Sequence, residues 1–366
     1  MRVLHINCNY IETPLHQIMI QHLDELGGDN YIFAPTYDKN LSIISEREKV
    51  CISECFNKWD RLLFDYKQKK IKKSVQESMD VASFDCIHAY TLFTDGNCAM
   101  ELSKKYNIPY IVAIRNTDIN DFMKKMIYLR GRGVMIMRRA KAIFFLSETY
   151  RKQMFEKYIP LQYRDELMKK SHIIPNGIDN FWFENKPSTE RHFCNENTIN
   201  LIYAGRVEKN KNISTTQKAM RLLREKGYKV SLTVVGKIEE RKEFDKISRD
   251  TWTTYISPVS KERLIDYYGS HDIFVMPSFK ETFGLVYAEA MSQGLPIIYT
   301  RGQGFDGQFD EGVVGYSVNP KCPEEIADKI VSILNNYQEM SERCLVHVRK
   351  FDWKKIVNFY AEIYSS

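Results

Sequence analysis

The stretch FVMPSFKETFGLVYAEAMSQGLPI, residues 274–297, carries the signature of a strand, a loop, a helix and the start of a second strand. The apolar run that opens it ends at Met276, the loop contains Glu281 and the turn at Gly284, and a helical pattern follows. A buried strand, a crossover helix and another buried strand form the repeating unit of a parallel sheet. The stretch therefore predicts an α/β fold.

The same rhythm extends outward to both ends of the chain. Short apolar runs predict strands at 3–8, 30–34, 86–90, 108–114 and 142–146, and then at 199–204, 231–235, 254–256, 273–277 and 296–300. Helical patterns cover 15–26, 58–78 and 95–105, and then 213–226, 261–269 and 323–337. Two such series predict two doubly wound, Rossmann-like domains with parallel sheets.

The length of 366 residues also favours two domains. Residues 175–200 are rich in Pro, Asn, Ser and Thr and are predicted to be the hinge. We expect an N-terminal domain at 1–180, a C-terminal domain at 181–349, and a last helix at 350–366 that packs back onto the first domain. A ligand is then expected at the strand ends that face a cleft between the domains.

Composition excludes several classes of protein. With 53 basic and 47 acidic side chains the net charge of +6 is too small to indicate nucleic-acid binding. No membrane span or export signal is recognisable, so a cytoplasmic location is expected. The eight cysteines are scattered without metal-ligand spacing, which predicts neither a metal site nor disulfides.

Two glutamates flank the turn of the opening stretch. Glu281 precedes the helix and Glu289 lies within it, so both can face a ligand above the helix N-terminus. That terminus offers free N–H groups to a phosphate, Gly284 permits close backbone approach, and a carboxylate such as Glu289 can accept both hydroxyls of a ribose. The alternative is that both glutamates are solvated charges at a helix end.

A second candidate follows the first strand of the second series, in the sequence YAGRVEKNKN at 203–212. Gly205 ends the strand, and Arg206 and Lys211 lie in the loop that opens the next helix. Two fixed cations there could clamp a diphosphate. Ordinary surface charge is the alternative for each of them taken alone.

The runs GRVEKNK and PSFKETFGLVYAEAMSQGLPI together resemble glycosyltransferase family 4, a retaining family with the GT-B architecture. Glu281 and Glu289 match its E-x7-E motif, and Arg206 and Lys211 match its diphosphate-binding pair. The segment IIPNGID at 173–179 and the terminal FDW sequence are also similar to family segments.

The resemblance implies transfer of a sugar from a nucleotide sugar to an acceptor hydroxyl. Arg206 and Lys211 would stabilise the leaving diphosphate, Glu281 would contact the sugar, and Glu289 would hold the ribose. The backbone at Gly205, Phe283, Gly284 and Leu285 would line the donor site. No D-x-D sequence occurs, so no divalent metal or other cofactor is expected.

The first half departs from the family pattern. The loop that contains Asn9 lacks the usual glycines and could serve the acceptor instead. Arg115 stands where many members have a histidine, and Asn116 follows it. His88, at another strand end, could approach the acceptor or be a structural histidine.

Residues 122–141 hold seven basic side chains and no acidic one, interleaved with Met, Ile and Val. They could form a surface helix that lies on anionic lipid, or a solvated helix with an ordinary buried face. Nucleic-acid binding is disfavoured because no aromatic stacking platform accompanies the charges.

These features predict a retaining, metal-independent glycosyltransferase that uses a nucleotide sugar, most plausibly UDP-linked, and a glycan or lipid-linked acceptor in surface polysaccharide synthesis. Two alternatives stay open. One is a sugar-nucleotide epimerase of the same fold, although no convincing acid/base set is visible. The other is a non-catalytic module that binds nucleotide sugar.

Overall fold

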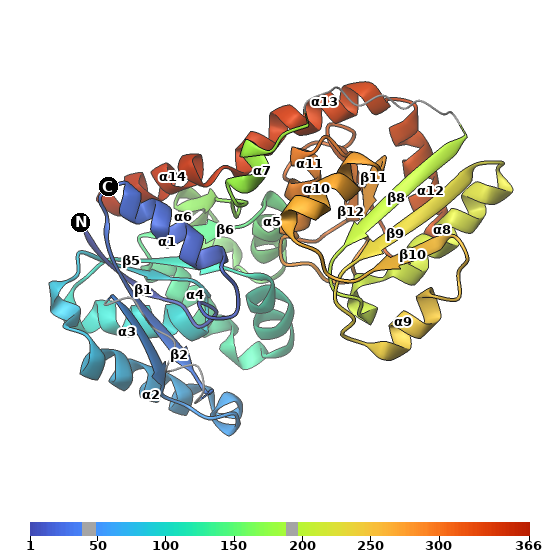
Figure 1. The fold of residues 1–366 in the computed structure, drawn as a ribbon. Coiled ribbons are helices and arrows are strands. Elements are labelled where there is room, and N and C mark those ends of the chain that lie inside the picture. Colours follow the sequence, from blue (N-terminus) through green and yellow to red (C-terminus); the bar gives the residue numbers. More distant parts are fainter. Residues whose placement is uncertain (39–48, 188–196) are drawn as a thin grey trace. The chain divides into compact units, whose positions relative to one another are not determined.

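A computed structural model describes residues 1–38, 49–187 and 197–366. Residues 188–196 of the predicted hinge, with Cys194, lie outside the described residues. The chain divides into two compact units. Unit 1 comprises Met1–Gly177 and Trp353–Ser366, and unit 2 comprises Ile178–Asp352. Each unit is built around one sheet (Figure 1).

Unit 1 contains a seven-stranded parallel sheet in the order β3-β2-β1-β4-β5-β6-β7. Neighbouring strands pair in parallel throughout, for example β1 with both β2 and β4. The strands are β1 Arg2–Ile6, β2 Asp29–Thr36, β3 Val50–Glu54, β4 Cys86–Ala89, β5 Tyr110–Ile114, β6 Ala142–Phe145 and β7 Ser171–Ile173. The strand order reverses between β1 and β4, which makes their carboxyl ends the switch point of this sheet.

Helices cover both faces of the unit 1 sheet. They are α1 Leu15–Glu25, α2 Phe64–Ser78, α3 Thr94–Tyr106, α4 Arg130–Arg139, α5 Glu148–Lys157, α6 Leu161–Lys169 and α14 Trp353–Ser365. The apolar faces of α1 and α14 share one buried cluster with the sheet, in which Met19 and Tyr360 are representative members. On the other face α3 packs closely on β5. The lack of a side chain at Gly96 permits this approach, since a Cβ atom there would lie only 2.9 Å from Val112.

Unit 2 contains a six-stranded parallel sheet in the order β10-β9-β8-β11-β12-β13. Its strands are β8 Thr198–Ala204, β9 Lys229–Val235, β10 Thr253–Ile256, β11 Ile273–Val275, β12 Ile297–Thr300 and β13 Gly315–Val318. Its helices are α7 Phe181–Glu184, α8 Ile213–Glu225, α9 Arg241–Ile247, α10 Lys261–Gly269, α11 Leu285–Ser292, α12 Pro323–Leu334 and α13 Tyr337–His347. Here the strand order reverses between β8 and β11.

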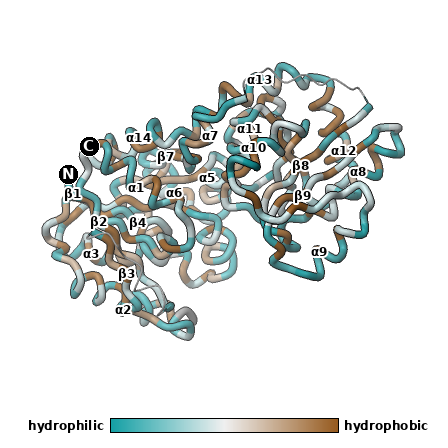
Figure 2. The backbone as a smooth tube through the Cα atoms, viewed as in Figure 1, coloured by the Kyte–Doolittle hydropathy of each residue, from teal (hydrophilic) through white to brown (hydrophobic). Residues whose placement is uncertain are grey.

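Hydrophobic residues gather along the strands, as β8 and the neighbouring strands in Figure 2 show, whereas α9 is largely hydrophilic. The predicted class, α/β with two doubly wound parallel sheets, is confirmed. Three strands were missed in the sequence: β3, β7 and β13. Each lies at the edge of its sheet, where one side of a strand has no neighbour to bury it, and their sequences VCISE, SHI and GYSV mix polar with apolar residues.

Two predicted helices have a different form. The pattern over 58–78 contains a short 3-10 turn, Trp59–Leu62, and then α2, because Leu63 between them has ψ near 80° and leaves the helical region. The stretch 122–141 is not one helix: it contains the end of a π-helical turn at Asp118–Met123, a 3-10 turn at Ile127–Leu129, and α4. Within the residues that the structure describes, no helix is both long and apolar enough to cross a membrane.

Candidate functional site

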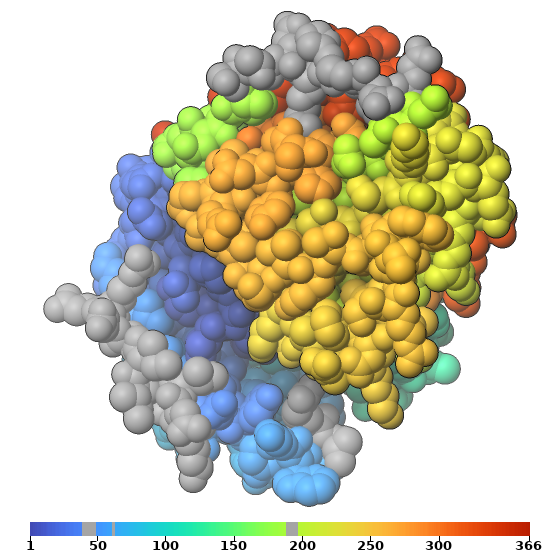
Figure 3. All heavy atoms as spheres, turned by 45° about the vertical axis from the view of Figure 1, so that its right-hand side comes forward, coloured from blue at the N-terminus to red at the C-terminus, as the bar shows by residue number. Residues whose placement is uncertain are grey.

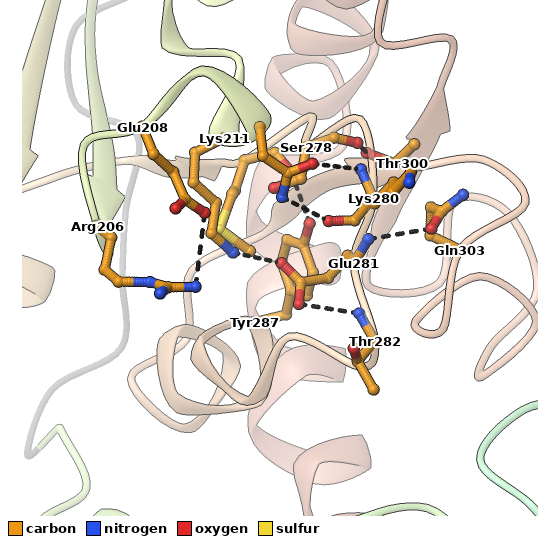
Figure 4. A network of polar contacts seen from close by, with 12 residues as sticks. Arg206, Glu208, Lys211, Ser278, Lys280, Glu281, Thr282, Tyr287, Thr300 and Gln303 are labelled. Atoms are coloured by element: carbon orange, nitrogen blue, oxygen red, sulfur yellow. Dashed lines mark hydrogen bonds and ion pairs between the residues drawn. The ribbon is translucent and has the colours of Figure 1, made fainter. Parts of the chain in front are cut away.

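The loops after β8 and β11 lie side by side at the switch point of the unit 2 sheet. Strands β8 and β11 pair directly, with Ile273 opposite Leu201, so the residues after their carboxyl ends emerge next to each other. In open α/β sheets such a switch point is where ligands bind. The first loop holds Arg206 and Lys211, and the second holds Glu281 (Figure 4).

Lys211 and Glu281 form an ion pair across the two loops. The Nζ atom of Lys211 lies 2.7 Å from Oε2 of Glu281, and the side chains are only 14% and 12% exposed. The other carboxylate oxygen of Glu281 accepts the backbone N–H of Thr282 at 3.1 Å. Because both charges are largely removed from water, loss of either side chain would leave the other largely buried without its ion-pair partner. Two residues predicted separately from the sequence therefore act as one structural unit.

Arg206 lies beside this pair with most of its surface exposed (Figure 4). Its side chain is 61% exposed, and its guanidinium makes only a long contact of 3.5 Å to Glu208. The backbone of Arg206 is held in place by a hydrogen bond, in which the buried Tyr203 hydroxyl donates to the Arg206 carbonyl at 2.6 Å. Burial raises the pKa of Tyr203, so this hydroxyl stays protonated and keeps its donor role. The geometry leaves the fork of Arg206 available to an incoming anion.

Glycines allow the ends of β8 and β9 to approach closely. A Cβ atom on Gly236 would lie 1.8 Å from the carbonyl oxygen of Gly205, and both glycines have φ near +150°. A side chain at position 236 would push the two loops apart. Gly205 therefore shapes the site through its backbone.

Two asparagines that the sequence did not single out hold the loops together. Asn210 makes three hydrogen bonds to the other loop: its amide nitrogen donates to the Lys280 carbonyl at 2.9 Å, its side-chain oxygen accepts the Lys280 N–H, and its carbonyl accepts the Phe279 N–H. Asn212 has φ of +58° at the start of α8, and its amide donates to the carbonyls of Pro277 and Pro320. The sequence signal available was asparagine at a strand-to-helix turn, where it tolerates positive φ.

Helix α11 begins at Gly284, directly after Glu281 and Phe283. Gly284 has φ of +79°, and a Cβ there would lie 2.4 Å from the Tyr287 ring, so only glycine fits. No side chain forms a cap hydrogen bond at this end of the helix, so its first N–H groups are left without a side-chain partner. The side chain of Phe283 is buried against Phe305 and Phe351. The predicted role of Phe283 and Leu285 therefore concerns their backbone atoms, because the Phe283 ring is buried.

Glu289 lies further along α11 and makes no contact with the Lys211–Glu281 pair. Among the described residues no group donates a hydrogen bond to its carboxylate. Burial raises its pKa to about 7, an effect that Lys261 opposes and Asp179 reinforces. Lys261 and Asp179 pair with each other. An unpartnered, partly buried carboxylate is poised to accept hydroxyl donors from a ligand.

The acceptor-side candidates lie in unit 1 and are mostly engaged in structural contacts. Arg115 follows β5, is 8% exposed, and donates from Nε to the Tyr90 carbonyl and from Nη1 to Asn176. The amide of Asn116 donates to the Tyr150 hydroxyl. Asn9 donates its backbone N–H to the side chain of Asn7.

His88 is enclosed in the core of unit 1. It has no exposed surface, its Nδ1 lies 2.7 Å from the Tyr364 hydroxyl on α14, and its ring stacks on Tyr90 at 4.3 Å. Burial is the main cause that lowers the pKa of His88 well below its usual value, and so the ring is neutral. Of the two interpretations of His88, this environment supports the structural one, because an acceptor cannot reach the ring in this conformation.

Asp118 is a buried carboxylate that sequence reasoning did not select. It accepts the backbone N–H groups of Leu92, Phe93 and Arg115 at 3.0, 3.3 and 2.8 Å. It thereby ties the loop after β4 to the loop after β5. Burial raises its pKa to about 6 against the opposing effect of these three bonds. The sequence feature that could have led to its selection is a carboxylate three residues after Arg115, in the loop that follows β5.

Among the described residues no group of three or more His, Cys, Asp or Glu side chains is arranged to hold a metal ion. The polar network at the unit 2 switch point is built from Lys, Arg, Glu, Asn and Gln instead, with Gln303 accepting the N–H of Glu281. Its chemistry suits an anionic ligand held by fixed cations and backbone N–H groups.

The whole chain resembles solved two-domain structures. The match to sucrose-phosphate synthase from Thermosynechococcus elongatus covers 100% of this chain and 98% of that one, with a TM-score of 0.76 and 16% identity. HepE of Anabaena, solved in complex with UDP-glucose, gives a TM-score of 0.68 at 16% identity over 100% of this chain and 99% of that one. These likenesses establish the fold, and the class is GT-B.

The sequence comparisons match part of the chain to one family of glycosyltransferases. Residues 185–350 match the family "Glycosyl transferases group 1". D-inositol 3-phosphate glycosyltransferase of Paenarthrobacter aurescens is 26% identical over 206 residues, which cover 52% of this chain and 50% of that protein. The capsular polysaccharide biosynthesis glycosyltransferase CapM of Staphylococcus aureus is 29% identical over 170 residues, 44% of each chain. The likeness to the glycosyl transferase group 1 family, also called family 4, therefore covers most of unit 2. The chain spans about half the length of the curated relatives it matches.

Proposed function

We propose that this protein is a retaining glycosyltransferase that moves a sugar from a nucleotide sugar to a hydroxyl of a glycan or lipid-linked acceptor. The observation that carries the proposal is the Lys211–Glu281 ion pair with Arg206 beside it, at the switch point of the unit 2 sheet. Cations at this position neutralise the charge that develops on a departing diphosphate.

Each donor-side residue has a distinct proposed task. Arg206 and Lys211 hold the diphosphate, and the N–H groups at the start of α11 bind its oxygens. Glu281 contacts the transferred sugar and keeps Lys211 in place. Glu289 accepts the ribose hydroxyls when it is ionised. In the transfer step the bond from the anomeric carbon to the diphosphate oxygen breaks, and the acceptor oxygen bonds to that carbon on the same face. The acceptor proton leaves to the diphosphate.

The acceptor side is proposed for unit 1. Arg115, Asn116 and Asn9 follow strands β5 and β1 at the carboxyl edge of that sheet, where a ligand of a doubly wound domain binds. His88 supports this edge from within the core. We assign it no contact with the acceptor.

The relatives support the choice of donor and pathway. HepE was solved with UDP-glucose, and CapM is named for capsular polysaccharide biosynthesis. We therefore propose a UDP-sugar as donor and surface polysaccharide assembly at the inner face of the plasma membrane as the process. No divalent metal is part of the proposed mechanism, because Arg206 and Lys211 supply the positive charge.

Calorimetric titration with UDP, GDP, ADP and CMP tests the donor site. Each nucleotide is titrated once with EDTA and once with magnesium. We expect micromolar binding of UDP that magnesium does not change. Binding that requires the metal, or no binding of any nucleotide, would remove the basis for the proposed roles of Arg206 and Lys211.

Product analysis separates this function from its two alternatives. An epimerase converts its nucleotide sugar with no acceptor present, and a non-catalytic module binds it without transfer or hydrolysis. A glycosyltransferase deprived of acceptor releases the free sugar slowly, because water replaces the acceptor. Chromatography of the nucleotide sugar after long incubation distinguishes the three outcomes.

A further inference from the structure

Large apolar side chains are exposed on two segments of unit 1 that are far apart in the sequence. Trp59 is 79% exposed, and Leu63 and Tyr66 are 62% and 51% exposed, all at or just before the start of α2. Ile127 and Tyr128, just before α4, are 66% and 73% exposed. Single exposed apolar residues are ordinary, but a group of five with two Tyr and one Trp is not.

The two segments contact each other. The ring of Phe64, the first residue of α2, lies 6.5 Å from that of Phe122, and Asp65 pairs with Arg132 at 3.4 Å. Phe122 and Arg132 stand on either side of Ile127 and Tyr128 in the chain. We group the exposed residues of these two contacting segments under one name, the α2–α4 surface. Its members are Lys58, Trp59, Leu63, Tyr66, Lys69, Lys124, Lys125, Ile127 and Tyr128.

Positive charge is concentrated in the same two segments. Residues 58–73 contain seven basic and two acidic side chains, and residues 122–132 contain four basic and no acidic ones. Their combined net charge of +9 exceeds the +6 of the whole chain. The rest of the protein is therefore net negative, and the cationic character of the chain is local to this region.

The acidic groups that face the surface are already paired. Asp60 pairs with Lys70 at 2.7 Å, Asp65 with Arg132, and Asp121 with Lys125. No carboxylate among the described residues pairs with Lys58, Lys69 or Lys124, which are all exposed. These three ammonium groups remain for an external anion. Figure 3 shows the segment around the start of α2, in light blue at the lower edge, as part of the outer surface.

This arrangement bears on the two alternatives left open for 122–141, a helix that lies on lipid and a solvated helix with an ordinary buried face. Most of the apolar side chains of that stretch are buried, among them Met123, Val134, Ile136 and Met137. They form core contacts and cannot enter a bilayer. Only its first part, with Ile127 and Tyr128, joins the α2–α4 surface.

We propose that the α2–α4 surface docks on the anionic surface of a lipid bilayer. Trp, Tyr and Leu side chains insert at the level of the headgroups, while lysines around them contact lipid phosphates. Helices α2 and α4 each follow a strand of a parallel sheet, so their N-termini lie at its carboxyl edge. Docking there places lipid headgroups at the edge that carries Arg115 and Asn9. The acceptor class that fits this geometry is a membrane-anchored, lipid-linked glycan.

Vesicle sedimentation of the full chain tests the surface without any sugar substrate. Vesicles contain neutral phosphatidylcholine alone or with roughly a third phosphatidylglycerol. We expect binding to the anionic vesicles to exceed binding to neutral ones by about tenfold or more, and to weaken at high salt. Equal binding to both, or none to either, overturns the proposal.

Two double variants separate the contributions of charge and of apolar insertion. Lys69→Glu with Lys124→Glu should lower anionic vesicle binding by about tenfold or more. The matched control, Lys242→Glu with Lys321→Glu, makes the same change in net charge at exposed sites of unit 2 and should leave binding unchanged. Trp59→Ala with Tyr128→Ala should abolish the binding that persists at high salt.

The control variants also decide between partners. If the unit 2 variant loses as much binding as the surface variant, attraction is non-specific and the proposal fails. Binding to RNA or heparin without binding to vesicles also overturns it. Thermal melting of each variant confirms folding first. The vesicle experiment contains no nucleotide sugar, so it is independent of the nucleotide titration. Vesicle binding can fail while UDP binds, and UDP binding can fail while the vesicles bind.

Discussion

The carboxyl edges of the two sheets both carry polar side chains but use them differently. At the edge of unit 2, Lys211 and Glu281 bind each other from neighbouring loops, and Arg206 beside them is mostly exposed. At the edge of unit 1, Asp118 is buried and binds three backbone N–H groups. At the first edge Arg206 is thus open to a ligand, while the polar residues described at the second edge mostly build the loops. In the sequence, charged residues follow the strands at both edges. Only the partners that these residues bind in the structure show which edge is open to a ligand.

The largest expected effect follows from removing the cation of unit 2. Lys211→Ala should lower kcat for transfer by about a hundredfold or more, because charge on the departing diphosphate loses a preorganised partner. Glu281 would also be left largely buried without its ion-pair partner, so the melting temperature should fall. Initial rates with saturating donor measure the first effect and calorimetry the second.

The control for this variant is Lys209→Ala, which removes an exposed lysine two residues away in the same loop. Its rate should stay within a factor of about two of the unchanged protein, since an exposed charge makes little fixed interaction. A Lys211→Ala protein that retains full activity would contradict the assignment of the donor site to the carboxyl edge of the unit 2 sheet.

A medium effect is expected when the buried histidine of unit 1 is removed. His88→Ala should destabilise the protein by about 2–4 kcal/mol, because it leaves a cavity beneath Tyr90 and takes the partner from the Tyr364 hydroxyl. The KM for acceptor should be unchanged. Chemical denaturation and acceptor titration are the two measurements. A raised KM with unchanged stability would show that His88 meets the acceptor after all.

The smallest expected effect is a pH dependence at Glu289. Its pKa of about 7 lies above the ordinary value of 4.5, so the carboxyl is mostly protonated below pH 7 in the free protein. Ribose hydroxyls need the ionised form as acceptor. Because the ribose hydrogen bonds supply only part of the binding energy, the association constant of the nucleotide should rise by about tenfold in all between pH 5 and pH 7 and level off above it. Titration calorimetry from pH 5 to pH 8 measures this.

Glu289→Gln serves as the matched variant. Its affinity should be lower and flat across this range, and a slope equal to that of the unchanged protein would assign the dependence to another group. The free energy of unfolding should also depend on pH differently in the unchanged protein and in the Glu289→Gln variant. Because the folded-state pKa is raised, the native protein loses stability as pH rises from about 4.5 to 7, and the Gln variant does not.

The sequence predicted the fold class because buried strands of parallel sheets are continuous apolar runs, such as 142–145. It missed β3, β7 and β13 because an edge strand needs no such run. It also predicted the residues at the unit 2 switch point, since Gly205 and Gly284 mark the turns that hold them. It did not predict that Lys211 would pair with Glu281, because the pairing depends on which strands are neighbours.

For unit 1 the sequence left His88 with two interpretations, and only burial decides between them. The same limit applied to 122–141, where alternation of cations with apolar residues does not reveal which apolar side chains are covered. Met137 is buried and Tyr128 is exposed, although both lie among basic residues. The surface with the stronger apolar character lies partly at the start of α2, where we did not expect it.

The position of α14 has a consequence for how the protein is made. Trp353, Ile356 and Tyr360 belong to the core of unit 1, yet the ribosome adds them only after the whole of unit 2. Synthesis proceeds at about 5–20 residues per second, so residues 1–177 wait for about ten seconds or more with the apolar side of α1 uncovered. During that time unit 2 can form from an uninterrupted stretch of chain. Synthesis of unit 1 therefore starts before that of unit 2, but unit 1 can complete its core only after unit 2 has been synthesised.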